Sequence, residues 1–578
     1  MRTGRARRRA WAGGGAAILP ALALAVALAL PACQRAPGPG PALAPADPLA
    51  AHRIRADVAL LADDRMQGRA AGTRGYRLAS EYVARRMRRI GLEPAGDDGG
   101  WFQAVPLLRA VREREGARLA VVREGATREL AFGDEFLPEP HYHAAEYRLQ
   151  APAVFVGQAV HAPGLGHDDL AGLDLAGRIA VAFAGAPAGF EPVHRAFHGS
   201  RREKLRVLAE RGAVGVVWVG TADDEAHAPW ARTAAQWRRP GMRLRDAAGR
   251  AIDGFPQLRA QASVSAAAAD ALFAGSGRTA AQLFAAARDG SLRGFPLPGT
   301  LVLAGRTRIE PLASRNVVGR LPAAPPERPG DARAGEYVVH TAHLDHLGVG
   351  VPVDGDAIHN GALDNALGVA VMLEAARELA RAPRPPRRAM LFVALTAEEQ
   401  GLLGAEWFVR NPTVPRRALV ANINTDMPAL LAPASDLVAI GTGHSSLKRA
   451  VEAAARDLGV ALSPDPFPEE AVFLRSDQYA FVRAGIPALY MDGGVVPARR
   501  PAPGAAPDPG SDPKLALRRF LRSCYHRPCD DATQPIQYPD AARLARLNAQ
   551  LALRIGADPG RPRWNEGDFF GERFGGGD

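Results

Sequence analysis

A chain of 578 residues with 47% apolar and 23% charged residues is long enough for several domains and too apolar to be disordered throughout. Its formal charge is +11, but five arginines lie within the first nine residues, and subtracting them leaves +6 for the rest. Because those charges form no long basic run, the composition argues against a nucleic-acid partner.

Residues 1–32 are typical of a signal peptide. A basic start precedes an Ala- and Leu-rich run from Ala16 to Leu30, which is short for a helix that spans a bilayer. The run ends in Leu30-Pro31-Ala32-Cys33, which resembles a bacterial lipobox, so Cys33 is expected to carry a lipid. Residues 33–48 would form a tether. These features predict an extracytoplasmic protein, lipid-anchored on the periplasmic face of the outer membrane. The alternative, after ordinary cleavage, is a secreted or free periplasmic protein.

Residues 49–145 are predicted to form the first part of a catalytic domain. Apolar positions between Ile54 and Leu92 recur at helical spacing, and Gly91 is suited to end the second helix. The glycine-containing stretch 65–73 lies between the two helical segments. It lacks the spacing of a phosphate-binding loop, so it is expected to be a connector.

Residues 146–298 differ in style and predict a β-rich insert. Short apolar runs at 153–156, 179–183 and 214–219 alternate with glycine turns and one helix near 202–211. The segment contains no cluster of His, Asp and Glu at ligand spacing. Its order of strands and helix resembles the protease-associated domain, which implies a non-catalytic role.

Residues 299–556 alternate between strands and helices, which predicts a three-layer α/β/α catalytic domain. The helices are expected over 363–380 and 445–458, and ligands should gather at the carboxyl ends of the strands. The strands are expected at 337–340, 391–395, 419–424 and 488–491. The polar, glycine-rich residues 557–578 are predicted to be a flexible tail.

Candidate metal ligands follow these strands or open a helix. They are His343, Asp364, Glu399, Asp426 and His526, and Asp345, Glu398 and Tyr525 lie next to them in the sequence. Imidazole and carboxylate ligands without thiolate suit zinc. Two ions can share one bridging carboxylate and a water of lowered pKa. The adjacent pair Glu398 and Glu399 can then supply both a base and a ligand.

The motifs together resemble the zinc aminopeptidase family that includes bacterial leucyl aminopeptidases, glutamate carboxypeptidase and the transferrin receptor. The matching stretches run in the family's order over roughly residues 54 to 551, interrupted by the insert. They are Ala342-His343-Leu344-Asp345-His346, Asn360-Gly361-Ala362-Leu363-Asp364-Asn365, Thr396-Ala397-Glu398-Glu399-Gln400-Gly401-Leu402-Leu403-Gly404, Asn424-Thr425-Asp426, Ser476-Asp477, Gly485-Ile486-Pro487 and Tyr525-His526.

The resemblance implies a zinc-exopeptidase (phosphorylase/hydrolase-like) fold, two Zn²⁺ ions per chain and peptide substrates cleaved from the amino terminus. It assigns zinc ligation to His343, Asp426, Glu399 and His526, a bridging role to Asp364, the general base to Glu398, the orientation of His343 to Asp345, and oxyanion stabilisation to Tyr525. Two positions depart from the family's usual residues, namely Leu363 and Leu367, and both concern local packing rather than ligands.

Several alternatives remain open at this stage. A carboxypeptidase or a single-zinc, glutaminyl cyclase-like transferase could use the same fold, and a non-catalytic binding protein is a third possibility. His346 and His359 are expected to support the site or lie in loops. Asp477 and Asp530 are expected to make structural hydrogen bonds. Outside the cytoplasm, Cys524 and Cys529 could pair or remain reduced.

Overall fold

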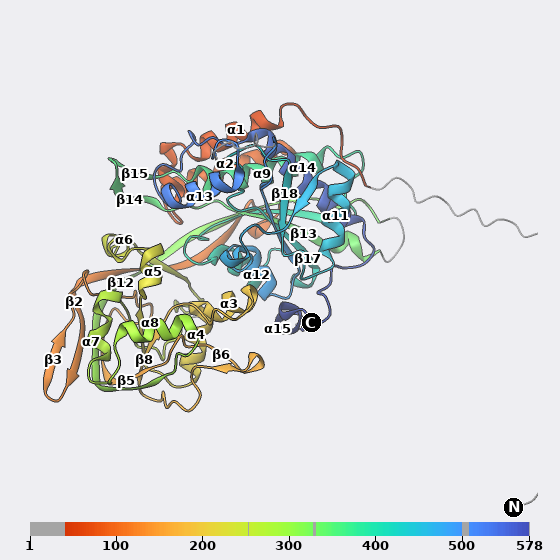
Figure 1. The fold of residues 1–578 in the computed structure, drawn as a ribbon. Helices are drawn as coiled ribbons and strands as arrows, with labels where there is room; N and C mark the ends of the chain where they lie inside the picture. The colour runs from red at the N-terminus through yellow and green to blue at the C-terminus, as the bar shows by residue number, and fades with distance from the viewer. Residues whose placement is uncertain (1–40, 253, 327–330, 500–507, 577–578) are drawn as a thin grey trace, which may run out of the picture. The chain divides into compact units, whose positions relative to one another are not determined.

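The computed structural model describes residues 41–252, 254–326, 331–499 and 508–576 (Figure 1). The predicted signal peptide, Cys33 and the first part of the tether lie outside the described residues. None of the helices within the described ranges combines the length and apolar character needed to cross a bilayer.

Two amphipathic helices begin the described chain, α1 (Ala50–Leu61) and α2 (Arg74–Ile90). They bury Ile54 and Val58 from α1 and Val83 from α2. Gly91, at φ 98°, ends α2 as predicted, because a left-handed residue there lets the chain turn away from the helix. The predicted connector between the helices contains a short 3₁₀ segment, Asp64–Arg69.

The centre of the catalytic domain is a mixed sheet whose predicted strands are confirmed. Four neighbouring strands are parallel, and they are β13 (Tyr337–His343), β16 (Ala389–Leu395), β17 (Leu419–Asn424) and β20 (Ala488–Asp492). The sheet extends on one side through β18 (Asp436–Ile440) and β19 (Ala461–Ser463), and on the other through β12 (Phe295–Leu321). Buried parallel strands explain the near-continuous apolar runs in the sequence.

Helices cover both faces of this sheet, which confirms the three-layer prediction (Figure 1). Val338 and Phe392 face a layer formed by α1, α2, α9 (Gly368–Ala380), α11 (Leu447–Leu458) and α14 (Tyr538–Ala557). Val339 and Leu391, one position along each strand, face α10 (Leu403–Arg410) and α12 (Gln478–Arg483). The alternation follows from the two-residue period of a strand.

A long two-stranded ribbon joins the catalytic domain to the insert. β2 (Phe102–Arg123) pairs antiparallel with β12 from Phe102↔Val317 to Val122↔Thr300. Beyond this ribbon the sheet continues through β5 (Glu146–Phe155), β8 (Ile179–Phe183), β9 (Gly215–Val219), β11 (Ala260–Val264) and β4 (Phe136–Pro138). β3 (Ala126–Glu129) pairs with the outer half of β2.

The insert differs from the prediction in two respects. Its sheet already includes β3 and β4, so residues before 146 contribute to it, because β2 continues unbroken from the catalytic domain. It is also mixed α/β rather than mainly β. Its helices are α3 (Pro192–Gly199), α4 (Arg201–Glu210), α5 (Ala222–His227), α6 (Trp230–Ala235), α7 (Ala269–Phe273) and α8 (Ala280–Asp289).

The prediction of a flexible tail is wrong for most of residues 557–578. The helix α15 (Phe569–Phe574) packs on the catalytic domain, and Phe570 is fully buried beside Phe473 and Val482. The Trp564 indole donates a hydrogen bond of 3.0 Å to the Gly485 carbonyl. Aromatic side chains within the glycine-rich sequence supply apolar contacts that composition alone does not indicate.

Candidate active site

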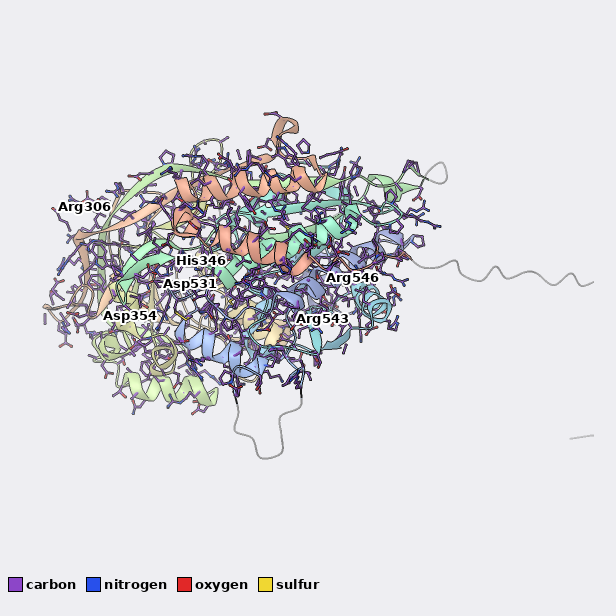
Figure 2. The ribbon with its side chains drawn as sticks, turned by 90° about the horizontal axis from the view of Figure 1, so that it is seen from above. Arg306, His346, Asp354, Asp531, Arg543 and Arg546 are labelled. Carbon is purple, nitrogen blue, oxygen red and sulfur yellow. A yellow bond between two sulfur atoms is a disulfide. The ribbon has the colours of Figure 1, made fainter. Side chains whose placement is uncertain are left out.

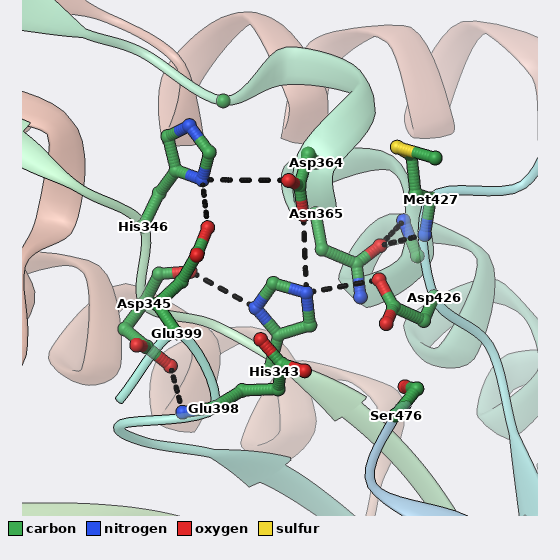
Figure 3. Close-up of polar contacts among 12 residues, drawn as sticks. His343, Asp345, His346, Asp364, Asn365, Glu398, Glu399, Asp426, Met427 and Ser476 are labelled. Carbon is green, nitrogen blue, oxygen red and sulfur yellow. Dashed lines mark hydrogen bonds and ion pairs between the residues drawn. The ribbon is translucent and has the colours of Figure 1, made fainter. Parts of the chain in front are cut away.

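β13 ends at His343, and this imidazole lies between two carboxylates. Its Nε2 atom is 2.9 Å from Oδ1 of Asp426 and 3.2 Å from Oδ1 of Asp364 (Figure 3). Asp426 follows β17, the neighbouring parallel strand, so the shared sheet edge brings the two side chains together. Burial disfavours the charged ring, but the Asp426 and Glu398 carboxylates hold the pKa of His343 well above its ordinary value.

A second set of ligand atoms surrounds Glu399. Its Oε1 atom is 2.7 Å from Nδ1 of His346, and its Oε2 atom is 3.2 Å from Nε2 of His526. His526 Nε2 is also 3.2 Å from Oδ2 of Asp364. Asp364 therefore presents Oδ1 to His343 and Oδ2 to His526, as a bridging carboxylate would.

The residues present suit two cations. Within the described residues, His343, Asp364 and Asp426 form one potential metal-binding group, and His346, Asp364 and Glu399 form another. His346 Nδ1 and Glu399 Oε1 are close and buried, yet they do not form a hydrogen bond together. A shared cation would satisfy such atoms, and nitrogen and carboxylate ligands without sulfur suit zinc.

The chain fixes Asp364 through its backbone. Asp364 lies in an irregular turn before α9, and Asp530 accepts hydrogen bonds from the amides of Leu363 (2.8 Å) and Asp364 (3.1 Å). This agrees with the structural role predicted for Asp530. A side chain at Gly361, which is at φ 62°, would approach the Asp364 carbonyl to 2.2 Å, so this turn requires glycine.

Glu398 is a neighbour of both groups but belongs to neither. Burial first, and then the nearby Asp426, Asp477 and Glu399 carboxylates, raise its pKa well above the ordinary value. By contrast, His526 and His346 hold the pKa of Glu399 below its ordinary value despite burial. Two adjacent carboxylates with opposite shifts are suited to different tasks, one as a proton acceptor and the other as a ligand.

Asp345 contacts His343, as its predicted orienting role requires, but it does so through its backbone. The Asp345 backbone carbonyl, rather than its side chain, lies 3.0 Å from Nδ1 of His343. The carboxylate instead accepts a hydrogen bond of 3.1 Å from the Glu398 amide (Figure 3). Asp345 thus links the histidine loop to the turn that carries Glu398, and burial raises its pKa to about 6.

His346 is a functional candidate that the sequence analysis underestimated. Its ring is buried in the middle of the molecule (Figure 2), and Nδ1 lies 2.7 Å from Glu399 and 3.8 Å from Asp364. The His-Leu-Asp-His spacing carried the signal, because residues 343 and 346 leave the same strand end. His359 belongs to neither of the two metal-binding groups found among the described residues, and its supporting role stays a prediction.

Arg69 was missed because its sequence context suggested only a connector. Its guanidinium is fully buried and donates to the carbonyls of Leu344 (2.9 Å), Asn360 (2.5 Å) and Gly361 (3.0 Å). A fourth bond, of 2.6 Å, reaches the Leu61 carbonyl. One side chain therefore joins the loop after His343 to the turn before Asp364. Burial lowers its pKa to about 10, so it remains charged at neutral pH.

A cavity of about 290 Å³ opens beside the metal-binding groups, and we call it the acidic pocket. Tyr525 and His526 form one side of it, with their rings stacked at 3.8 Å. Apolar side chains form much of the wall, namely Met427, Ala429, Ile440, Phe467, Val472, Leu517 and Leu521. The carboxylates of Asp465 and Asp492 also line it, and burial raises the pKa of Asp492 to about 7.

Comparison with known proteins identifies the catalytic domain. Residues 316–552 match the sequence profile of "Peptidase family M28". This stretch is therefore a domain of the M28 family, and it contains both potential metal-binding groups. Over 88% of its length the fold also resembles "Aminopeptidase from Aneurinibacillus sp. strain AM-1", covering 95% of that chain with a TM-score of 0.50 and 19% identity. At this identity the likeness supports the fold alone.

Curated relatives match over a shorter stretch of the chain. It is 42% identical over 76 residues, 13% of its length, to a "Probable zinc metalloprotease" of Pyrenophora tritici-repentis. A protein of the same description from Pyrenophora teres f. teres is likewise 42% identical over 76 residues. The matched part spans only about a sixth of these relatives, 17% and 16% of their lengths.

Proposed function

We propose that the protein is an exported zinc aminopeptidase that removes N-terminal residues from peptides. The observation that carries this proposal is the pair of metal-binding groups that share Asp364, with Glu398 beside both and part of neither. Such an arrangement suits two zinc ions and a separate base.

Each residue of the site has a defined task in this proposal. His343, Asp364 and Asp426 would hold one zinc, while Asp364, Glu399 and His526, with His346 alongside, would hold the other. Bound zinc would supply a Lewis acid and lower the pKa of water. Glu398 accepts the proton of the attacking water and returns it to the leaving nitrogen, a task that its raised pKa favours. Tyr525, at the wall of the acidic pocket, donates to the developing oxyanion.

The charge of the acidic pocket favours an amino-terminal over a carboxyl-terminal substrate residue. Arg475, a cation among the lining residues, already pairs with Glu470 at 3.1 Å. Asp465, together with Asp492 above its pKa of about 7, therefore leaves the pocket negative. A free α-ammonium group is attracted there, whereas a terminal carboxylate is repelled.

A substrate panel tests this proposal directly. Purified protein should hydrolyse an aminoacyl anilide with a free amine and should not hydrolyse its N-acetyl form. Metal analysis of the same sample should give two zinc ions per chain. Cleavage of N-acetyl dipeptides instead would indicate a carboxypeptidase, and one zinc with no hydrolysis would favour a transferase of the glutaminyl cyclase type.

Export and lipid anchoring at Cys33 form a second part of the proposal. The signal-like residues 1–32 and the lipobox resemblance support it. Wild-type protein should partition with the outer membrane, and Cys33→Ser should release or mislocalise it. The disulfide between Cys524 and Cys529 is compatible with an oxidising compartment. Within this proposal the insert serves as a protease-associated, non-catalytic domain.

A further inference from the structure

A second and larger cavity, of about 530 Å³, borders the residues that follow Glu398 and Glu399. Gln400 and Gly401 line it, whereas Glu398 lines the acidic pocket. The remaining wall comes mostly from the insert, including residues 139–143, 201, 202, 205, 239–241, 243 and 244. The four residues 398–401 therefore border two cavities of different composition.

The larger cavity is rich in arginine. Its lining contains Arg112, Arg201, Arg202, Arg239 and Arg243, and we call it the arginine cavity. Its two carboxylates are already paired, Glu139 with Arg201 at 3.2 Å and Glu406 with Arg202 at 2.7 Å. The cavity consequently carries an excess of positive charge.

Three of these guanidinium groups have no acidic partner. In the described parts of the chain, no carboxylate lies within ion-pair distance of Arg112, Arg239 or Arg243. Arg112 donates to the Pro138 carbonyl at 3.3 Å, and Arg243 lies 4.9 Å from the centre of the Tyr142 ring. All three are only partly exposed. Partly buried, unpaired guanidinium groups favour a planar anion such as a carboxylate.

The position of the cavity relates it to the reaction. If the N-terminal residue of a peptide enters the acidic pocket, the remaining peptide must leave the scissile bond on another side. Gln400 and Gly401, which line the arginine cavity, directly follow Glu398 and Glu399 in the chain. The arginine cavity thus begins beside the metal-binding groups.

We propose that the arginine cavity binds a carboxylate of the leaving part of the substrate, which gives preference to short peptides with a free C-terminus or an acidic side chain near the cleaved bond. This inference rests on the proposed aminopeptidase activity. The two regions would then bind the two ends of one short peptide, the ammonium end in the catalytic domain and the carboxylate end against the insert.

The first test compares substrates that differ only in this carboxylate. For wild-type protein, KM for leucyl-glycyl-glycine should be roughly tenfold lower than KM for its C-terminal amide, since a hydrogen bond to a charged group is worth about 1.5 kcal/mol or more. If the carboxylate can come from a side chain, KM for leucyl-glutamyl amide should be as low as KM for leucyl-glycyl-glycine. Equal KM values for all three peptides would overturn the inference.

Matched variants test whether the arginine cavity causes the preference for the acid over the amide. Arg239→Gln and Arg243→Gln should each reduce the preference for the acid several-fold, and the double variant should abolish it. Arg238→Gln is the control, because Arg238 precedes Arg239 but is exposed, contacts Trp237 and does not line the cavity. None of these variants should change hydrolysis of leucyl anilide, which has no carboxylate. Unchanged discrimination in the double variant would assign the preference to another site.

A binding measurement separates this inference from the proposed function. N-acetyl-glycylglycine cannot be a substrate of an aminopeptidase, so calorimetry can compare its binding with that of its amide. We expect the acid to bind more tightly, the difference to shrink with salt, and Arg239→Gln to remove most of it. If leucyl anilide is not cleaved but this binding difference is present, the proposed function fails while the carboxylate site stands. If the anilide is cleaved and no difference is found, the reverse holds.

Discussion

The acidic pocket and the arginine cavity both border the segment 398–401, the first at Glu398 and the second at Gln400 and Gly401, and they carry opposite charge. The pocket is formed by the catalytic domain, and its Asp492 accepts hydrogen bonds from the Ala429 (2.7 Å) and Gly493 (2.6 Å) amides. The arginine cavity owes its charge to the insert and the ribbon that leads to it. Under the proposed function, the catalytic domain would carry the chemistry and bind the amino-terminal residue, and the insert would bind the rest of the substrate.

The difference also explains why the insert contains no candidate catalytic residue. Its arginines are dispersed over β2, β10 (Gly241–Leu244) and the chain before β10, and folding brings them to one wall. Only the wall formed by residues 400–406 belongs to the catalytic domain. An insert can therefore change which peptides are preferred without changing the metal-binding groups.

The largest effect on activity is expected from substitutions at Glu398 and Glu399, which lie in the turn next to both cavities. Glu398→Gln should retain both metals and reduce kcat by about 10²–10⁴-fold with little change in KM, because it removes the proton acceptor. Glu399→Gln should instead weaken metal binding, and added zinc should restore part of its activity. Near-normal turnover by fully metal-loaded Glu398→Gln would contradict the assignment of the base.

Metal occupancy should depend on Asp364 more than on any other carboxylate. Asp364→Asn is expected to lower the affinity of both sites, since each group uses one oxygen of this residue. Asp530→Asn, which alters only the residue that holds the Asp364 backbone, should cost about 10–100-fold in affinity. Zinc titration with a chelating indicator measures the zinc affinity of both variants. Loss of only one ion in Asp364→Asn would argue against bridging.

The charge of the acidic pocket should influence substrate binding more modestly. Asp492→Asn keeps the shape of the side chain but removes its charge, so KM for a free-amine anilide should rise by roughly tenfold, within the range for hydrogen bonds to charged groups. Little change in kcat is expected. Glu469→Gln is a suitable control, because Glu469 is exposed and does not line the pocket. An equal rise in both variants would mean that general charge, rather than the pocket, is responsible.

The sequence was most informative where function follows local pattern. His343, Glu399 and Asp426 could be predicted because each follows a buried strand, and parallel strands place such residues along one edge. The role of Arg69 could not be predicted, and neither could the fact that Asp345 contacts His343 through its backbone carbonyl. These contacts depend on loops that are distant in sequence and meet only in the fold. Arg112, Arg239 and Arg243 show the same limit, because no spacing along the chain marks a wall built from separate elements.

The catalytic domain and the insert each contain a buried cationic side chain. Arg69 holds the loops that carry the metal-binding residues, and Lys204 lies inside the insert. The Lys204 amine donates to the Phe183 carbonyl at 3.4 Å and to the Gly185 carbonyl at 2.5 Å. Burial lowers its pKa from 10.5 to about 7. Between pH 7 and 10.5 the unfolded chain therefore binds a proton at this position that the folded chain does not. The free energy of unfolding should rise with pH in that window and be insensitive to this group below it.

Lys204→Met tests this expectation at a site far from the metals. The variant should lose a slope of at most about 1.4 kcal/mol per pH unit in the free energy of unfolding above pH 7, whatever its effect on stability at a single pH. Denaturant unfolding at pH 7, 8 and 9 measures the slope, and exposed Lys448→Met provides the matched control. Hydrolysis of leucyl anilide should be unchanged, since Lys204 lines neither cavity. Identical slopes in the two variants would show that Lys204 remains charged in the folded insert, and its carbonyl contacts would then act as a permanent cation site rather than a neutral one.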